Sequence, residues 1–397
     1  MKIVQINAVV EYSSTGRTTS ELHKVLKDAG HQSWVAAPNA IDSLESIKIG
    51  DKSDHKVHSI ISRVFGRQGY ASYFSTLKLI KRLKHIDPDI IHLRNLHANY
   101  INLPLLFKYL SRNRIPVVIT LHDCWFFTGH CCYFTDTNCD RWKMGCGNCP
   151  DLKNWNTSLF FDRTRSNLQD KAKFFASLSK LAVVGVSKWV TNFVPYSILK
   201  SAQIIKPIYN WIDTELFSPK KTNLRQTLGL EDDKIILCVA QTWNRQKGID
   251  DIIKLANILP SFKFLLIGNV DSSVQLPINI ISIGAVNDAS KLANYYSIAD
   301  VFFNPSIRET FGKVTVEALS CGTPVVAYNA TATPELVPKN CGILVEIGDL
   351  YNVASAIERI VSNKSIRTEC REFAVKTFSK DIIIRQYLEL YEQILHG

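Results

Sequence analysis

The chain alternates between short apolar runs and longer segments in which apolar residues recur every three or four positions. The runs at 2–10, 115–121 and 301–303 are typical of strands that are buried on both faces of a parallel sheet. The segments 17–30 and 312–320 have helical spacing. Because strands and helices alternate along the whole chain, the pattern predicts an α/β protein built from βαβ units.

This alternation starts twice. One series ends with an apolar strand at 204–209, and another begins with the strand at 234–240. A chain of 397 residues is long enough for two domains. We therefore expect two α/β domains, with the boundary between the strands at 204–209 and 234–240.

The most informative stretch is 299–317, which reads ADVFFNPSIRETFGKVTVE. A helix that begins near Gly312 places Glu309 just before its N-terminus and Glu317 on its second turn. A helix N-terminus suits a phosphate, and carboxylates beside it can accept hydrogen bonds from sugar hydroxyls. The stretch therefore predicts a site for an anionic sugar compound. The alternative is that both glutamates are solvated charge on a surface helix.

The two glutamates have seven residues between them, and the stretch resembles the E-x7-E signature of the family 4 retaining glycosyltransferases. The resemblance covers essentially the whole chain. It implies the α/β GT-B fold, in which two Rossmann-like domains face a central cleft. Domain 1–210 would take the acceptor, domain 211–380 would bind a nucleotide sugar, and helix 381–397 would pack back on the first domain.

The resemblance also implies a donor site in the second domain. Glu317 would bind the ribose, and Lys247 with Arg245 would bind the diphosphate, where negative charge builds as the glycosidic bond breaks. Lys247 matches the family pattern directly, whereas Arg245 is a shifted substitute for the family's arginine. Backbone amides near Phe311 and Gly312 would help to hold the phosphates.

Two polar residues of the first domain, His122 and Asp123, follow the strand at 115–121. They are therefore at a carboxyl strand end, where α/β domains bind ligands. The resemblance implies that His122 contacts the donor sugar opposite Glu309, so we expect these two to be the catalytic residues. We expect Asp123 on the acceptor side.

The turn after the first strand contains Gly16 and Arg17. It resembles the glycine-containing loop that the family places against the diphosphate and the acceptor. This implies that Gly16 contacts the donor and that Arg17 faces the acceptor. An ordinary turn between a strand and a helix is the alternative.

The implied reaction moves a sugar from a UDP- or GDP-sugar to a hydroxyl of a glycan or lipid-linked acceptor, with retention, in bacterial polysaccharide biosynthesis. The family generally lets the leaving phosphate accept the proton of the incoming hydroxyl, so no protein nucleophile is implied. The chain has no Asp-x-Asp motif at a strand end, and we expect no cofactor to be required for catalysis. A glycan phosphorylase or a nucleotide-sugar epimerase on the same fold is an alternative.

Cysteines cluster after the strand at 115–121, where six of the ten lie between 124 and 149. Clustered cysteines in a cytoplasmic protein favour a metal over disulfides. One interpretation is a structural zinc, and free buried thiols are the alternative. The predicted zinc ligands are Cys131 (or its neighbour Cys132), Cys139, Cys146 and Cys149.

The positive charge of the chain is uneven. Residues 1–210 hold 28 Lys and Arg against 15 Asp and Glu, a net charge of +13, while the whole chain carries +11. Such asymmetry suggests that the first domain meets an anionic partner. Amphipathic helices with basic faces at 58–66 and 70–84 would suit an anionic membrane. The alternative is that their apolar stripes pack in the domain core.

A zinc-containing, basic nucleic-acid-binding protein is the candidate from a different functional class. The sequence shows no nucleic-acid motif, so we expect no nucleic-acid partner. It also shows no secretory signal and no apolar run of eighteen residues. We therefore expect a cytoplasmic protein that contacts the membrane peripherally.

Overall fold

A computed structural model describes residues 1–154, 156–363 and 365–397 of the protein. The chain divides into two compact units. Unit 1 comprises Met1–Ile208 and Ile384–Gly397, and unit 2 comprises Tyr209–Ile383. These boundaries lie two and three residues from the positions expected from the sequence, 210/211 and 380/381.

Unit 1 contains a seven-stranded parallel sheet with the order β3-β2-β1-β4-β5-β6-β7. Its strand order reverses between β1 and β4, which are neighbours and pair in register from Ile3 with Ile90. Such a reversal opens a crevice at the carboxyl ends of the two strands. The strands are β1 (Lys2–Ile6), β2 (Gln32–Ala37), β3 (Ser46–Lys48), β4 (Ile90–Leu93), β5 (Val117–Leu121), β6 (Leu181–Gly185) and β7 (Ile204–Pro207).

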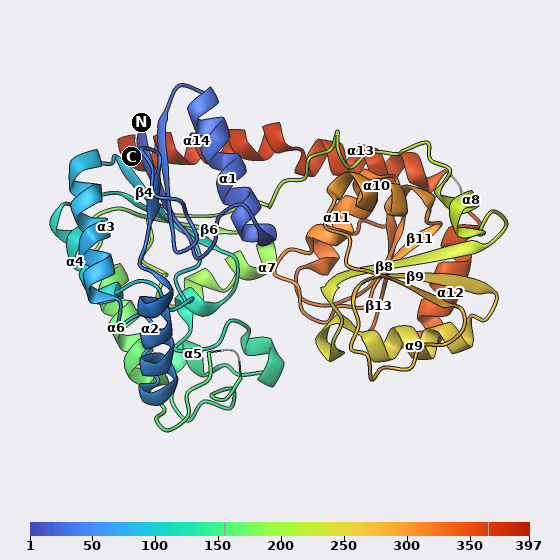
Figure 1. The fold of residues 1–397 in the computed structure, drawn as a ribbon, viewed down its shortest axis with the longest axis horizontal. Helices are drawn as coiled ribbons and strands as arrows, with labels where there is room; N and C mark the ends of the chain where they lie inside the picture. Colours follow the sequence, from blue (N-terminus) through green and yellow to red (C-terminus); the bar gives the residue numbers. More distant parts are fainter. Residues whose placement is uncertain (155, 364) are drawn as a thin grey trace. The chain divides into compact units, whose positions relative to one another are not determined.

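Helices cover both faces of this sheet, with α1 and α14 together on the side away from α4 and α6 (Figure 1). The apolar stripe of α14 packs on the sheet. The hydroxyl of Tyr391 lies 2.7 Å from Nδ1 of His92 in β4, and that of Tyr387 lies 3.3 Å from Oγ1 of Thr120 in β5. The α-helices are α1 (Ser13–Asp28), α2 (Lys52–Phe65), α3 (Tyr73–Ile86), α4 (Leu103–Arg112), α5 (Arg141–Met144), α6 (Thr164–Ala176), α7 (Lys188–Thr191) and α14 (Lys380–His396). Short 3-10 turns are η1 (Trp125–Phe127), η2 (Phe134–Thr137) and η3 (Val194–Tyr196).

Two helices of unit 1 begin earlier than the sequence pattern predicted. Helix α1 starts at Ser13 instead of residue 17, and its N-cap residue Tyr12 makes no side-chain capping hydrogen bond. Helix α2 starts at Lys52 instead of residue 58, because the side chain of Asp51 caps it. For α2, a polar side chain outside the apolar pattern therefore decides the boundary.

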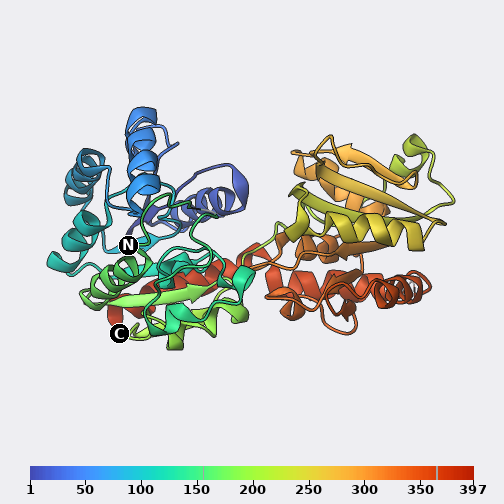
Figure 2. The ribbon, with the colours of Figure 1, turned by 90° about the horizontal axis from the view of Figure 1, so that it is seen from below.

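Unit 2 contains a six-stranded parallel sheet with the order β10-β9-β8-β11-β12-β13, and its order reverses between β8 and β11. Helices α10, α11 and α13 cover one face and α9 and α12 the other (Figure 1), and α9 lies in front of the strands in Figure 2. The strands are β8 (Lys234–Thr242), β9 (Phe262–Asn269), β10 (Ile280–Gly284), β11 (Val301–Asn304), β12 (Val325–Tyr328) and β13 (Gly342–Val345). The helices are α8 (Leu224–Leu228), η4 (Arg245–Lys247), α9 (Ile249–Ile258), α10 (Ala289–Ile298), α11 (Lys313–Ser320), η5 (Thr333–Glu335), α12 (Leu350–Val361) and α13 (Ile366–Phe378).

The buried runs behave as the sequence predicted. Strand β11 is buried along its whole length, since Val301, Phe302 and Phe303 have no exposed surface. Apolar side chains from strands and helices close the core of each unit. The α/β prediction with two doubly wound sheets is confirmed, and each sheet has one reversal point where ligands are expected.

Candidate functional site

The reversal point of unit 2 holds an ion pair. Lys247, in η4 after β8, places its Nζ 2.5 Å from Oε1 of Glu309 and 3.4 Å from Oγ of Ser306. Gly248 makes this approach possible, because its φ is +78° and a Cβ there would lie 2.5 Å from the Cβ of Pro305. The missing side chain therefore lets η4 pack directly on the loop that carries Glu309.

The loop after β11 fixes Glu309 through its backbone. Its N–H donates to Oγ1 of Thr331 at 2.9 Å, and its carbonyl oxygen accepts from the N–H of Ala332 at 3.2 Å. The carboxylate itself stays partly accessible, with 15% of the side chain exposed. Glu309 is thus held in place while its carboxylate remains available to a ligand.

Helix α11 starts as the sequence predicted, with Gly312 as its N-cap at φ +97°. Phe311, just before it, is buried against the rings of Tyr209 and Phe378 at 5.9 and 5.7 Å. Glu317 lies one turn further along α11 and is buried, and its Oε2 accepts a hydrogen bond from Tyr296 at 3.1 Å. A buried carboxylate with a hydroxyl donor is a fixed acceptor rather than solvated surface charge.

Of the residues expected to bind the donor, the structure brings Lys247 and Glu309 into direct contact, with Gly312 and Glu317 on the helix that follows. Arg245 lies at the start of η4 and is exposed. Their roles toward a substrate stay predictions.

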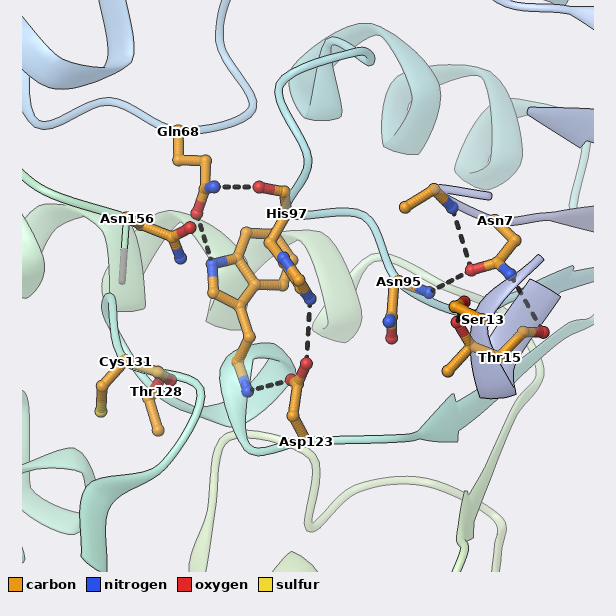
Figure 3. Close-up of polar contacts among 12 residues, drawn as sticks. Asn7, Ser13, Thr15, Gln68, Asn95, His97, Asp123, Thr128, Cys131 and Asn156 are labelled. Atoms are coloured by element: carbon orange, nitrogen blue, oxygen red, sulfur yellow. Dashed lines mark hydrogen bonds and ion pairs between the residues drawn. The ribbon is translucent and has the colours of Figure 1, made fainter. Parts of the chain in front are cut away.

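The reversal point of unit 1 is organised by Asn7, which directly follows β1. Its Oδ1 accepts from the N–H groups of Ala8 at 2.9 Å and Asn95 at 3.2 Å, and its Nδ2 donates to Oγ1 of Thr19 at 2.9 Å. Figure 3 shows Asn7 between Asn95 and the first turn of α1 with Ser13 and Thr15. One amide thus joins the ends of β1 and β4 to α1.

Gly16 and Arg17 lie in the first turn of α1, so the predicted loop at this position is a helix. Gly16 is buried, and a Cβ there would come within 3.3 Å of the backbone of Val10 and Glu11. Arg17 is exposed. The glycine therefore serves the close packing of the turn on the preceding loop, and both predicted substrate contacts stay predictions.

His122 follows β5 and lies beside Arg94, which follows β4. Nη1 of Arg94 is 3.4 Å from Nε2 of His122. A guanidinium can only donate, so Nε2 accepts and the neutral ring carries its proton on Nδ1. Burial, and then the charge of Arg94, lower the pKa of His122 to about 3. His122 therefore offers a neutral N–H donor, which suits a sugar hydroxyl.

Asp123 is held in a network away from Arg94. Its Oδ2 is 2.9 Å from Nε2 of His97, and its Oδ1 accepts from the N–H of Trp125 at 2.8 Å (Figure 3). Gln68 also bonds to both His97 and Trp125. It donates to the carbonyl oxygen of His97 and accepts from the indole N–H of Trp125. Burial alone would raise the pKa of Asp123, but His97 and these hydrogen bonds hold it below its ordinary value.

Metal-ligating side chains converge at a different place from the one predicted. Within residues 1–154, 156–363 and 365–397, the group of three or more whose ligand atoms lie within 4.8 Å of one another is His97, Asp123 and Cys132. Two of its members already bond to each other. Of this group, only Cys132 was among the predicted zinc ligands, as the alternative to Cys131.

The four predicted zinc ligands share one region of the cysteine-rich segment. After burial, the charges of Cys149 and Cys146 contribute to raising the pKa of Cys131 to about 12, and Cys139 contributes to the raised pKa of Cys146. Thiols with such pKa values must lose their protons to bind zinc. A structural zinc on Cys131, Cys139, Cys146 and Cys149 stays a prediction.

The start of this segment is pinned by Lys171 of α6. Its Nζ donates to the carbonyl oxygens of Trp125 at 2.6 Å and Thr128 at 3.0 Å, and it lies 3.4 Å from the centroid of the Trp125 ring. Burial lowers the pKa of Lys171 to about 7. The lysine therefore anchors the loop that leads from Asp123 into the cysteines.

Reasoning from the sequence missed several residues of both reversal points. Asn7 and Arg94 each directly follow a buried strand, which is the signal that identified His122. The partnership of His97 with Asp123 and that of Tyr296 with Glu317 leave no such signal, because each joins residues more than twenty positions apart.

Two family descriptions match the chain. Residues 15–216 match Glycosyltransferase Family 4, and residues 220–377 match Glycosyl transferases group 1. The first match alone covers half of the chain. Together they span both units.

Relatives and solved structures are similar to most of the chain. An uncharacterised 41.2 kDa protein in the cps region of Klebsiella pneumoniae is 26% identical over 380 residues, covering 89% of this chain and 93% of the relative. The putative colanic acid biosynthesis glycosyl transferase WcaC of Escherichia coli (strain K12) is 22% identical, covering 84% and 82%. The structure of Anabaena Alr3699/HepE, in complex with UDP and glucose, superposes with a TM-score of 0.70 at 18% identity, covering 99% and 100%.

In the described part of the chain, no helix is long and apolar enough to span a membrane.

The predicted GT-B fold and the predicted family are both confirmed. The chain belongs to Glycosyltransferase Family 4 and is a glycosyltransferase with the GT-B fold.

Proposed function

We propose that this glycosyltransferase is a retaining enzyme that uses a UDP-sugar and extends a lipid-linked glycan in bacterial polysaccharide biosynthesis. The single observation that carries the donor site is the Lys247–Glu309 pair in front of the helix that bears Glu317. A cation, a helix N-terminus and two carboxylates match the diphosphate, the sugar and the ribose of a nucleotide sugar.

In the absence of a donor, the ammonium group of Lys247 and the carboxylate of Glu309 form an ion pair with each other. An incoming diphosphate carries more negative charge than one carboxylate and competes for Lys247. The exchange releases Glu309 toward the hydroxyls of the sugar, while Glu317 accepts from the ribose. Donor binding would thus switch the partner of Lys247 and prepare Glu309 in one step.

In the proposed reaction the bond between the anomeric carbon and the diphosphate oxygen breaks, and the acceptor oxygen forms the new bond on the same face. The proton of the acceptor hydroxyl passes to the departing phosphate oxygen. Lys247, with Arg245 beside it, stabilises the charge that develops there. His122 donates Nδ1–H to a hydroxyl of the sugar, and no residue of the chain becomes covalently bonded.

Two named proteins support the choice of donor and product. HepE was solved with UDP and glucose, and WcaC is named for colanic acid biosynthesis. The proposal of UDP and of a polysaccharide product rests on this similarity. GDP is the alternative base.

The donor assignment is tested by thermal stabilisation with a panel of nucleotides and nucleotide sugars. We expect UDP to raise the melting temperature of wild type, and Glu317→Gln to lose most of this shift because a neutral amide binds the ribose less strongly. Glu358→Gln, an exposed glutamate of α12, is the matched control and should behave as wild type. Folded wild-type protein that no nucleotide stabilises would contradict the proposal. Sugar release or interconversion without an acceptor alcohol would favour a phosphorylase or an epimerase.

The proposed lipid-linked acceptor is supported by exposed apolar side chains in unit 1. On α2, Ile60 and Phe65 are 62% and 51% exposed while His58 is buried, and on α3 Phe74 is 80% exposed. These three side chains lie outside the core, whereas Leu79 and Leu83 of α3 are buried in it, as the alternative interpretation of this helix expects. Apolar groups next to basic ones suit the surface of an anionic membrane.

This proposal is tested by sedimentation with vesicles of phosphatidylglycerol or of phosphatidylcholine. We expect wild type to sediment with the anionic vesicles, and Ile60→Gln with Phe74→Gln to sediment several-fold less. Ile278→Gln removes an equally exposed apolar side chain from unit 2 and serves as the control. Equal sedimentation of all variants would argue against membrane contact through α2 and α3.

A further inference from the structure

Arg94 is a buried cation that has no acidic partner among the residues that the structure describes. It follows β4, and only 1% of its surface is exposed. Its Nη1 lies 3.4 Å from Oγ1 of Thr18 and 3.4 Å from Nε2 of His122. Its Nε and Nη2 have no hydrogen-bond partner among the described residues. Such a group is an exception, because buried polar atoms are normally satisfied.

The groups around Arg94 do not neutralise it. Burial lowers the pKa of Arg94, and the titratable side chains that act on it are Tyr387 and Tyr391 of α14, which burial keeps protonated. Asp123, the acid closest in the chain to His122, bonds to His97 and to the amide of Trp125 instead. Because a guanidinium keeps its proton in proteins, a full positive charge remains uncompensated.

An uncompensated charge in a protein interior destabilises the folded state, and an apolar or neutral residue at this position would relieve it. A protein that keeps such a charge at a ligand-binding position accepts a loss of stability for function. The position is the reversal point of the sheet, where Asn7 joins the ends of β1 and β4. Three partly buried side chains line this point, Thr15, Asn95 and His122.

We propose that Arg94, with His122 and Thr18, forms a subsite for an anionic group of a substrate, a carboxylate or a phosphate. The anion would accept hydrogen bonds from Nε and Nη2, which the protein leaves unpaired, while Nη1 keeps its contacts with Thr18 and His122. A planar guanidinium suits either oxyanion. This subsite lies in unit 1 and goes beyond the proposed donor site, whose residues Lys247, Glu309 and Glu317 are in unit 2.

Two sources would supply the anion. One is a donor whose sugar is a uronic acid, with a carboxylate at C6, since the neighbouring His122 is expected to contact the donor sugar. The other is an acceptor that carries a phosphate. Both present an oxyanion to the same guanidinium, and the experiment separates them.

The first test compares melting temperatures in sodium phosphate and in sodium chloride at equal ionic strength. Wild type, Arg94→Gln, Arg94→Lys and the control Lys24→Gln are measured; Lys24 is an exposed cation on α1. The general stabilising effect of phosphate is common to all four proteins. We expect wild type, Arg94→Lys and Lys24→Gln to gain an additional shift of a few degrees from phosphate, and Arg94→Gln to gain none.

The same data distinguish a binding role from a structural one. Without phosphate, Arg94→Gln should melt at or above the temperature of wild type, because it removes an unpaired buried charge. If Arg94→Gln melts well below wild type or does not fold, the arginine is structural and the proposal is overturned. An equal phosphate shift in Arg94→Gln and wild type overturns it as well.

The second test identifies the source. Stabilisation by UDP-glucuronate is compared with that by UDP-glucose, and stabilisation by glucose 1-phosphate with that by glucose. A loss of the UDP-glucuronate preference in Arg94→Gln assigns the anion to the donor, and a loss of the glucose 1-phosphate effect assigns it to the acceptor. If the variant changes neither, the subsite is rejected. UDP should stabilise wild type and Arg94→Gln equally, so failure of the donor site in unit 2 is read separately.

Discussion

The two units place their polar residues at the same topological point but treat charge in opposite ways. In unit 2 the cation Lys247 meets the carboxylate of Glu309 at 2.5 Å. In unit 1, the cation Arg94 bonds to the hydroxyl of Thr18 and the neutral ring of His122, and to no acid in the described part of the chain. Each sheet reverses its strand order at this point, so topology brings the residues there in both cases.

The difference shows that topology selects the place of a site and that side-chain pairing selects its electrostatic state. A ligand of unit 2 must displace an internal carboxylate before it binds Lys247. A ligand of unit 1 finds a charge that has no competitor. The two units also differ in their histidines, since all ten histidines of the chain lie in unit 1, outside Tyr209–Ile383.

The largest expected effect concerns acid. Burial lowers the pKa of His58 to about 4, that of His122 to about 3 and that of His92 well below its ordinary value. Protonation of these histidines therefore disfavours the folded state. Their contribution to the free energy of unfolding is fully present above pH 6.5 and is lost progressively as the pH drops toward 4. Each histidine contributes about 1.4 kcal/mol per pH unit at most. Hydrogen exchange between pH 7 and 4 should show unit 1 losing protection before unit 2.

A matched pair of variants checks the cause. His58→Gln should make the acid dependence shallower, whereas replacing the exposed His85 with Gln should leave it unchanged. If unit 2 loses protection first, the contrast between the units is wrong.

The second effect breaks the ion pair of unit 2. Lys247→Gln should lower kcat/KM by about 10²- to 10³-fold, because the departing diphosphate loses the cation that stabilises it. Lys254→Gln removes an exposed cation of α9 that lies 3.9 Å from Asp251, and it should change kcat/KM less than about 2-fold. Kinetics with the donor that stabilises the wild type would measure both. An active Lys247→Gln enzyme would show that this pair is structural.

A third comparison concerns the buried acceptor of unit 2. Glu317→Gln should weaken nucleotide binding by about 10- to 100-fold, because a hydrogen bond to a charged group contributes about 1.5–3 kcal/mol. Tyr296→Phe removes only the hydroxyl that orients the carboxylate and should weaken binding by about 2- to 10-fold. Calorimetric titration with UDP measures both values. The reverse order would mean that Tyr296, and not Glu317, contacts the nucleotide.

The smallest effect tests how the fold positions Lys247. Gly248→Ala should cost about 1 kcal/mol for its positive φ and more for the clash with Pro305, and it should also lower activity. Gly229→Ala has φ +66° with no atom within 4 Å of the new Cβ, so it isolates the φ term and should leave activity unchanged. Denaturant unfolding and kcat/KM of the two variants give the difference. Equal losses would show that close packing on Pro305 does not position η4.

Much of the site was predictable because its signals are local. The strand end after Leu121 identified His122, and the spacing of Glu309 and Glu317 around Gly312 placed both on one loop and helix, as observed. Arg94 carries the same strand-end signal as His122. Helix starts were less predictable, since Asp51 sets that of α2 through capping hydrogen bonds that no apolar period reveals.

By itself the sequence determined the alternation of buried strands and helices, the two sheets, and the family signature of residues 299–317. Only the tertiary structure decided which charges meet: Lys247 finds Glu309 across 62 positions, while Arg94 finds no acid. The physical reason is range. Apolar periodicity is set by neighbours along the chain, whereas an ion pair depends on strand order and on side-chain positions to within an ångström, which no local pattern specifies.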